Sequence, residues 1–250
     1  MIGMSCTGFS IDEPQAWLDR IVGRFELWEI FSECRHSISE RTDLFADLLP
    51  SYDLHYSVHS PISDTNIAAI NERIREASFQ VMVDTAKAAN RLDICTMTVH
   101  PGLASMAILA TEEMAMGIAK EMMPRLQKVS EEYGVTIAIE NMPEAPFFLG
   151  RTADALADII DGTDLSVCFD IGHANTTGQI DRMIDLFQDR IANIHIHDNC
   201  GDRDAHMTLG EGNIDFDHVL SKLSDYDGNF IIEARGFDSA LESQGFLESS

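Results

Sequence analysis

Histidines and carboxylates occur at regular places along this chain, each time just behind a short apolar run. The runs lead into YSVHSP, TVHPG, IAIENMP, CFDIGH, IHIHDN and IIEARG, and a further acid and imidazole lie in DAHMTLGEGNIDF. Imidazole and carboxylate groups are ligands of divalent metal ions, and acids that follow apolar strands are at least partly buried and need a partner. A shared cation would be that partner, and a hydrogen-bonded polar cluster is the less favoured alternative. The predicted metal ligands are His59, His100, Glu140, Asp170, His173, His195, Asp204, His206 and Glu233.

The spacing inside this set adds detail. Gly172 stands between Asp170 and His173, and we expect it to let the chain turn sharply at the end of the strand. His195 and His197 are two residues apart and share one face of a strand. We expect His195 to be the ligand, because His197 lies one step closer to the loop and to solvent.

Neighbouring polar residues and cysteines are expected to be structural. Glu29 lies near the end of the second apolar run and could join the site, although a solvated face is favoured. We expect His55 in the core and His36 at the surface. Cys95 and Cys168 fall in apolar runs, where a free thiol behaves as a small buried hydrophobic group. The five cysteines show no CxxC spacing and therefore indicate neither a disulfide framework nor a zinc ribbon.

The apolar runs alternate with longer segments of helical periodicity, such as NERIREASFQVMVDTAKAANRL. Strands separated by helices are typical of a parallel α/β fold. The length of 250 residues suits a TIM barrel, and the GxGxxG turn of an open doubly wound sheet is absent. We therefore predict one (β/α)8 TIM barrel, formed as a single domain by residues 1–250. The expected strands are 2–7, 25–32, 53–59, 93–100, 135–141, 165–171, 191–197 and 229–235.

A barrel of this kind explains why the candidate residues follow the apolar runs. Its strands all run the same way, and their carboxyl ends meet at one mouth, where active sites lie. Thr111 and Thr152 are expected to begin helices, and Gly134 is expected to end one. The last segment, SALESQGFLESS, is short for an eighth helix, so we expect a ragged closure at the C-terminus.

The charge of the chain limits its partners. Against 17 Lys and Arg stand 42 Asp and Glu, a formal net charge of -25. The negative electrostatic field of this charge repels a polyphosphate backbone, and salt screens this repulsion in part. DNA is therefore a less favoured partner. No apolar run approaches the roughly 18 to 20 residues that cross a bilayer, and the start lacks a signal-peptide pattern. We expect a cytoplasmic protein without a membrane partner, and a homo-oligomer is compatible with the sequence.

Taken together, these motifs resemble those of the xylose-isomerase-like TIM barrels. This superfamily joins sugar isomerases and epimerases to endonuclease IV, also called AP endonuclease family 2. The resemblance runs from about the third strand to the eighth and rests on VHPG, IEN, FDIGHAN, HIHD, H-x3-GEGNIDF and the glutamate of the last strand. The motifs are specific for the superfamily and much less so for one activity within it.

The two branches imply different metal contents. In the epimerase branch, the resemblance implies one Mn²⁺, Mg²⁺ or Co²⁺ ion, and its two glutamate ligands also exchange the proton next to the substrate carbonyl. The positions that match these ligands are Glu140, Asp170, His195 and Glu233. In endonuclease IV, the same four positions hold one zinc of a three-zinc cluster. The positions that match its further ligands are His59, His100, His173, Asp204 and His206.

A divalent-metal isomerase or epimerase of sugars or sugar phosphates is the favoured function. A metal ion would stabilise the enediolate, while Glu140 and Glu233 act as catalytic base and acid. The expected substrate contacts are His173, Arg203 and Arg235, with Arg151 as a further candidate.

The alternative function is a zinc phosphodiesterase that acts on abasic DNA. The complete set of matching ligands supports it, whereas the net charge and the lack of basic residues interleaved with aromatics oppose it. A barrel that binds metal and ligand without turnover is a third alternative, because fold alone does not define function.

Overall fold

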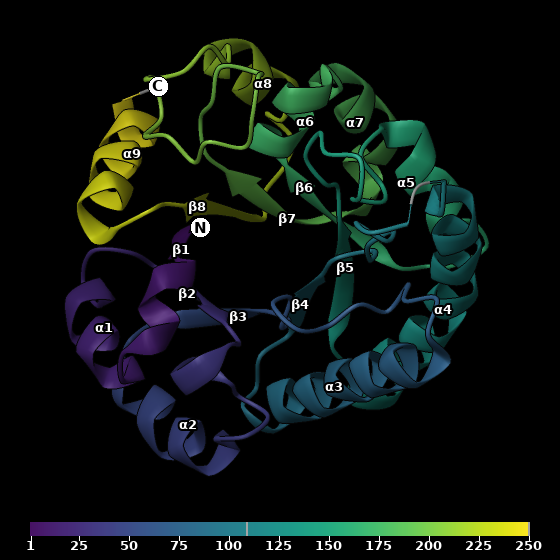
Figure 1. The fold of residues 1–250 in the computed structure, drawn as a ribbon. Helices are drawn as coiled ribbons and strands as arrows, with labels where there is room; N and C mark the ends of the chain where they lie inside the picture. The colour runs from purple at the N-terminus through teal and green to yellow at the C-terminus, as the bar shows by residue number, and fades with distance from the viewer. Residues whose placement is uncertain (109, 250) are drawn as a thin grey trace.

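In the computed structural model, which describes residues 1–108 and 110–249, eight parallel strands close into one barrel in sequence order (Figure 1). This confirms the predicted (β/α)8 architecture, and every strand overlaps its expected range. Strand β8 pairs with β1 from Ile2 to Ser5, so the expected ragged closure is wrong. The strands are β1 Ile2–Ser5, β2 Leu27–Phe31, β3 His55–His59, β4 Thr96–Val99, β5 Thr136–Glu140, β6 Ser166–Asp170, β7 Ile191–Ile196 and β8 Asn229–Glu233.

Helices form a ring around the barrel (Figure 1). None of the described helices is long and apolar enough to cross a membrane. The α-helices are α1 Pro14–Ile21, α2 Thr42–Leu48, α3 Glu72–Arg91, α4 Glu112–Tyr133, α5 Ala153–Ile159, α6 Ile171–Thr177, α7 Ile180–Phe187, α8 Phe216–Lys222 and α9 Phe237–Ser249. Short 3₁₀ helices are η1 Thr7–Ile11, η2 Cys34–His36, η3 Leu49–Ser51 and η4 Gln188–Arg190.

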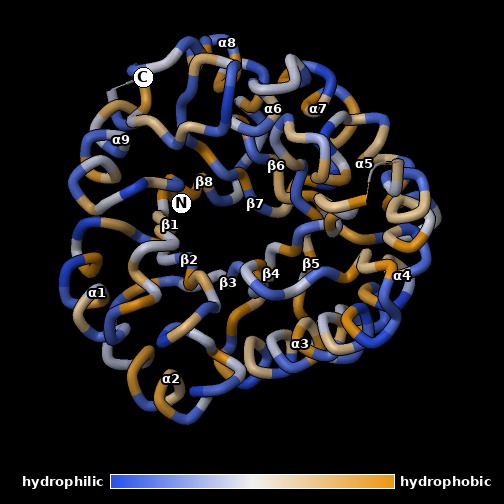
Figure 2. Tube along the Cα trace, viewed as in Figure 1, coloured by the Kyte–Doolittle hydropathy of each residue, from blue (hydrophilic) through white to orange (hydrophobic). Residues whose placement is uncertain are grey.

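The main apolar core lies between the barrel and its helices. Apolar and polar residues alternate along α3 and α4, so that each helix has an apolar side (Figure 2). Met82 and Ala86 of α3 and Met123 and Leu126 of α4 are buried in this layer. Burial of a large apolar side chain stabilises the fold by about 1.5–3 kcal/mol. The helices thus hold the strands in place without contributing most of the site.

The helix boundaries follow their expected chemistry at two of three positions. The side chain of Thr152 accepts a hydrogen bond from the backbone N–H of Ala155 at the start of α5. Gly134 ends α4 in the left-handed conformation with φ 64°. Thr111 precedes α4 but does not cap it, because its hydroxyl accepts a hydrogen bond from the backbone N–H of Ser105 instead.

Three expectations about single residues are wrong. His55 is exposed because it opens β3 at the end of the barrel opposite the mouth, and Cys95 is exposed just before β4. Cys168, in contrast, is buried as expected. His36 is completely buried, because η2 folds it against the edge of the Trp28 ring at a centroid distance of 5.3 Å.

The burial of His36 predicts a pH dependence of stability. Burial, with Arg41 nearby, lowers the pKa of His36 from 6.5 to about 4, so the folded protein resists protonation that the unfolded chain accepts. The free energy of unfolding should therefore fall as the pH drops from 6.5 towards 4. In urea denaturation, the free energy of unfolding of a His36→Leu variant should fall by about 2–3 kcal/mol less than that of the unsubstituted protein over this pH interval. Equal losses in the two proteins would contradict the assignment.

Candidate metal centre

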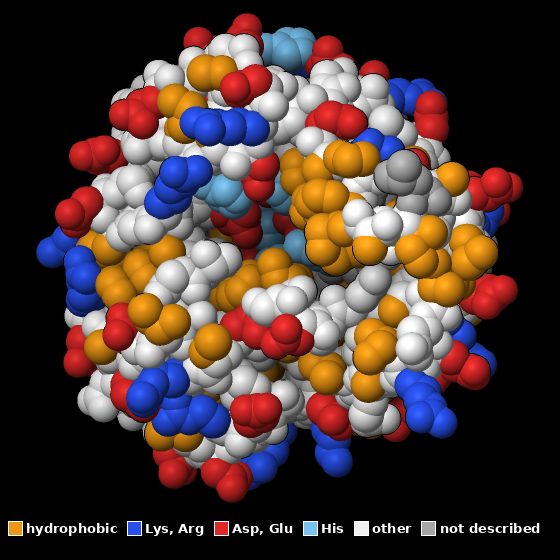
Figure 3. All heavy atoms as spheres, in the orientation of Figure 1, with side chains coloured by type: hydrophobic (Ala, Val, Ile, Leu, Met, Phe, Trp, Pro, Cys, Tyr) orange, Lys and Arg blue, Asp and Glu red, His pale blue; other side chains and the backbone are white. Residues whose placement is uncertain are grey.

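The carboxyl ends of the strands bring all nine expected ligand residues to one mouth of the barrel. Figure 3 looks onto this mouth, where histidine and acidic side chains lie in a central hollow. His59, Glu140, Asp170 and Glu233 are the last residues of β3, β5, β6 and β8. His100 follows β4, His195 lies in β7, His173 lies in α6, and Asp204 and His206 lie in the loop between β7 and α8.

The first cluster, which we call the central group, consists of Glu140, Asp170, His195 and Glu233. One donor atom from each residue lies within 4.8 Å of the others. Nδ1 of His195 lies 2.9 Å from Oε1 of Glu140 and 3.2 Å from Oε1 of Glu233. Oδ2 of Asp170 is the fourth atom of the group and lies 4.0 Å from the same nitrogen.

The second cluster, the β4 group, consists of His59, His100 and Glu140. Oε2 of Glu140 lies 2.8 Å from Nε2 of His100 and 3.3 Å from Nε2 of His59. The other oxygen of the same carboxylate belongs to the central group. Glu140 therefore links the two groups, and both of its oxygens are engaged.

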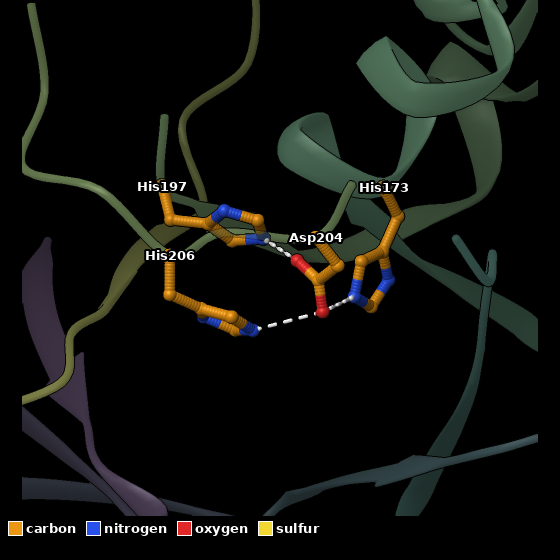
Figure 4. A group of neighbouring side chains, drawn as sticks. All are labelled: His173, His197, Asp204 and His206. Carbon is orange, nitrogen blue, oxygen red and sulfur yellow. Dashed lines mark hydrogen bonds and ion pairs between the residues drawn. The ribbon is translucent and has the colours of Figure 1, made fainter. Parts of the chain in front are cut away.

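The third cluster, the loop group, consists of His173, His197, Asp204 and His206 (Figure 4). Oδ2 of Asp204 lies 3.1 Å from Nε2 of His206 and 3.4 Å from Nε2 of His173. Its other oxygen, Oδ1, lies 3.4 Å from Nε2 of His197. Asp204 therefore lies between three imidazoles, one from α6 and two from the connection between β7 and α8.

The expectation that His197 lies nearer solvent is wrong, since its exposed fraction is 1%. Its burial also explains Gly172, which lies inside α6 rather than at a sharp turn. A Cβ at this position would lie 2.0 Å from Cε1 of the His197 ring. Nε2 of His197 is 3.3 Å from Oδ1 of Asp170, so this ring connects the loop group to the central group. The alternation of histidine and isoleucine in IHIHD was the signal in the sequence, because it places His197 on the same face of the strand as His195.

Charges of both signs are stabilised inside the mouth. Burial disfavours the Glu140 carboxylate, but His195 and His100 together hold its pKa well below the usual range. Burial likewise opposes protonation of His206, yet Asp204 and Glu233 raise its pKa to about 9. The carboxylates of the mouth therefore interact strongly with the positive charge of the neighbouring imidazoles.

Several buried oxygen and nitrogen atoms that could bind a metal ion have no hydrogen-bond partner among the described residues. In the mouth they are Oδ2 of Asp170, Oδ1 of Asp204, Oε1 of Glu29, Nε2 of His195 and both ring nitrogens of His197. A buried polar group without a partner costs about 1–3 kcal/mol, and more for a charged one. Carboxylate oxygens and imidazole nitrogens at these spacings fit divalent cations in all three groups.

Glu29 is a further member of the site that sequence reasoning placed on a solvated face. Its exposed fraction is 0%, and its Oε1 lies 3.0 Å from Nε2 of His195. The other oxygen accepts hydrogen bonds from the hydroxyls of Ser57 and Thr98, at 3.2 and 3.4 Å. A carboxylate in the middle of the apolar strand LWEIF was the available signal.

The expected arginine contacts remain predictions. Arg203 and Arg235 are exposed, the first in the loop of Asp204 and the second just beyond Glu233. Arg151 forms ion pairs with Glu112 and Glu144, at 2.6 and 2.9 Å. Its guanidinium therefore already has partners outside the mouth.

Known proteins of similar sequence and structure include an uncharacterized protein, an endonuclease and an epimerase-like protein. The chain is 34% identical over 233 residues to "Uncharacterized protein MJ1311" of Methanocaldococcus jannaschii, which covers 90% of this chain and 80% of that protein. A "Probable endonuclease 4" of Aquifex aeolicus is 25% identical over 248 residues, covering 90% and 79%. The crystal structure of a D-tagatose 3-epimerase-like protein superimposes with a TM-score of 0.90 at 30% identity, covering 99% and 96%.

The model of one family, described as a xylose isomerase-like TIM barrel, matches residues 23–250. This range includes every residue of the three groups, and the closed eight-stranded barrel agrees with the description. The chain belongs to the xylose isomerase-like TIM barrel family.

Proposed function

We propose that this protein is a multinuclear divalent-metal enzyme that hydrolyses phosphate esters of small molecules. The observation that carries the proposal is the double engagement of Glu140, whose two oxygens belong to two different ligand groups. A carboxylate shared in this way suits a link between two cations. This reverses the order of the two reactions expected from sequence, because a glutamate with both oxygens engaged is poorly placed to carry a substrate proton.

Cations bound in the three groups would polarise a phosphoryl oxygen and activate water, which is the usual contribution of such centres to hydrolysis. The water oxygen would give up a proton and form a bond to phosphorus, the ester P–O bond would break, and the departing alkoxide would take up a proton to leave as an alcohol. Asp170 and Asp204 would hold the cations with their buried oxygens that lack hydrogen-bond partners. The burial of His195 and His197 would keep bulk water away from the inner side of the centre.

The net charge of -25 supports a small substrate over a long polyanion such as DNA.

We further propose that residues 1–250 form one domain and that the protein acts in a reducing cytoplasm. The five cysteines are all unpaired, which agrees with that location.

A sugar epimerase or isomerase is the second candidate. One specific observation favours it: Glu140 and Glu233 each place an oxygen in the central group, at 2.9 and 3.2 Å from Nδ1 of His195. The similarity to a D-tagatose 3-epimerase-like structure supports the same reaction. This function needs the central group alone and leaves the loop group without a role.

The metal content distinguishes the two candidates. Protein loaded with zinc and then dialysed should retain at least two ions per chain, because the groups linked by Glu140 can each hold one. A His100→Ala variant should retain fewer ions by elemental analysis. His218→Ala is the matched control, since this exposed histidine pairs with Asp181 on the outer surface. A single ion in the unsubstituted protein would contradict the multinuclear proposal.

A His206→Ala variant separates the reactions directly. His206 belongs only to the loop group, so hydrolysis of p-nitrophenyl phosphate or bis(p-nitrophenyl) phosphate should fall about 100-fold or more. Deuterium exchange from D₂O into a ketose, next to its carbonyl, should be absent in both proteins. Exchange that persists in the variant, with no hydrolysis by either protein, would establish the epimerase instead.

Glu29 is expected to position His195 for metal binding. Oε1 of the buried Glu29 carboxylate lies 3.0 Å from Nε2 of His195, and this contact would orient Nδ1 towards the central group. Glu29→Gln should weaken the affinity of the central group for its ion about 10- to 100-fold in chelator competition. The metal-free variant should still show a cooperative thermal unfolding transition. Ser57→Ala, which removes only a hydroxyl from the same carboxylate, should have a smaller effect. Equal affinities in Glu29→Gln and the unsubstituted protein would refute the positioning role.

A further inference from the structure

An apolar cavity of about 250 Å³ opens beside the candidate metal centre. His100 lines the cavity and also belongs to the β4 group, so the two spaces adjoin. Figure 3 shows apolar side chains gathered along one side of the central hollow, next to histidine. The described wall residues include no Asp, Glu, Lys or Arg, although 24% of the chain is charged.

Most of the wall comes from the loops that follow β3, β4 and β5, the same strands that carry the β4 group, and Met82 of α3 and Val99 of β4 complete it. Leu103 and Met106 come from the second of these loops, and Phe147 and Phe148 come from the third. The two phenylalanine rings lie 4.7 Å apart and are tilted by 45°. A polyhydroxylated ligand would lose hydration against such a wall without gaining hydrogen bonds.

The cavity is preformed because its three loops are bonded to one another. Leu103 forms an antiparallel bridge with Phe148, and Ala104 donates a backbone hydrogen bond to the carbonyl of Phe147 at 2.8 Å. Asn66, from the loop after β3, donates to the carbonyl of Leu103 and accepts from its N–H, each at 2.9 Å. The polar groups of Asn66 are thus used within the wall, and a ligand would find a fixed apolar surface.

Ser60 is the exception among the polar wall residues. It is 1% exposed, and its hydroxyl oxygen has no hydrogen-bond partner in the described part of the chain. It directly follows His59, whose Nδ1–H donates to the Ser60 carbonyl at 2.9 Å. A buried hydroxyl without a partner, in a wall whose described residues include no Asp, Glu, Lys or Arg, is suited to one polar atom of a ligand.

We propose that this cavity is a substrate subsite for an aromatic ring, so that the substrate is an aromatic or heteroaromatic phosphate ester rather than a simple sugar phosphate. A cavity of about 150 Å³ holds benzene, so the space here suffices for one ring with a substituent. The ring would lie between the phenylalanines and His100, and a ring heteroatom or hydroxyl would bond to Ser60. The position of the phosphate at the centre rests on the proposed function, whereas the ring subsite does not.

Binding of matched phosphonates to the zinc-loaded protein tests this inference. Phenylphosphonate should bind about tenfold or more tightly than methylphosphonate in calorimetry, because only the first buries a ring. Met106→Glu, at a side chain that is 74% exposed, should bring the ratio towards one without affecting folding. Phe148→Ala should do the same. Met114→Glu, at another exposed methionine that does not line the cavity, should leave the ratio unchanged.

A ratio near one in the unsubstituted protein would overturn the proposal. If neither phosphonate binds, crystals soaked with phenol decide the outcome. Phenol between the two phenylalanines on one side and His100 on the other would support the aromatic subsite and count against the phosphate-ester function. A cavity that takes up no phenol in that case would overturn the subsite as well.

Discussion

The arrangement of this mouth depends on one shared carboxylate, Glu140. It ends β5 with an exposed fraction of 1%, and its two oxygens contact imidazoles that come from β3, β7 and the segment after β4. Negative charge at this depth is tolerated only when positive charge lies close by. The same constraint applies to Asp170 and Asp204, and it explains why buried acids and histidines converge on one place that cations can fill.

The inside of the barrel supports this centre in an unusual way. Branched apolar side chains usually fill a barrel of this type. Here Glu29 lies beneath His195 and is surrounded by Ser57, Thr98 and the amide of Asn193. A buried ionised carboxylate is costly to the fold on its own. The Glu29 carboxylate would orient the imidazole of His195 for metal binding. Its burial lowers the stability of the fold but fixes the geometry of this ligand.

The sequence predicted the strands and the gathering of nine side chains because both follow from simple rules. Apolar runs separated by helical periodicity define a parallel barrel, and parallel strands bring their ends to one mouth. Depth inside the barrel was harder to predict, since strand tilt decides how deep each position lies. Glu29 and His197 were therefore placed in solvent, although both are buried. His36 was misplaced because nothing local shows that η2 folds back against Trp28.

The metal positions themselves test the central claim most directly. Anomalous diffraction at the zinc absorption edge, from crystals grown with zinc, would locate each ion relative to the side chains. We expect peaks on both sides of the Glu140 carboxylate, one near His100 and one near His195, with a further peak beside Asp204. Direct contacts between these acids and imidazoles, without anomalous density between them, would contradict it.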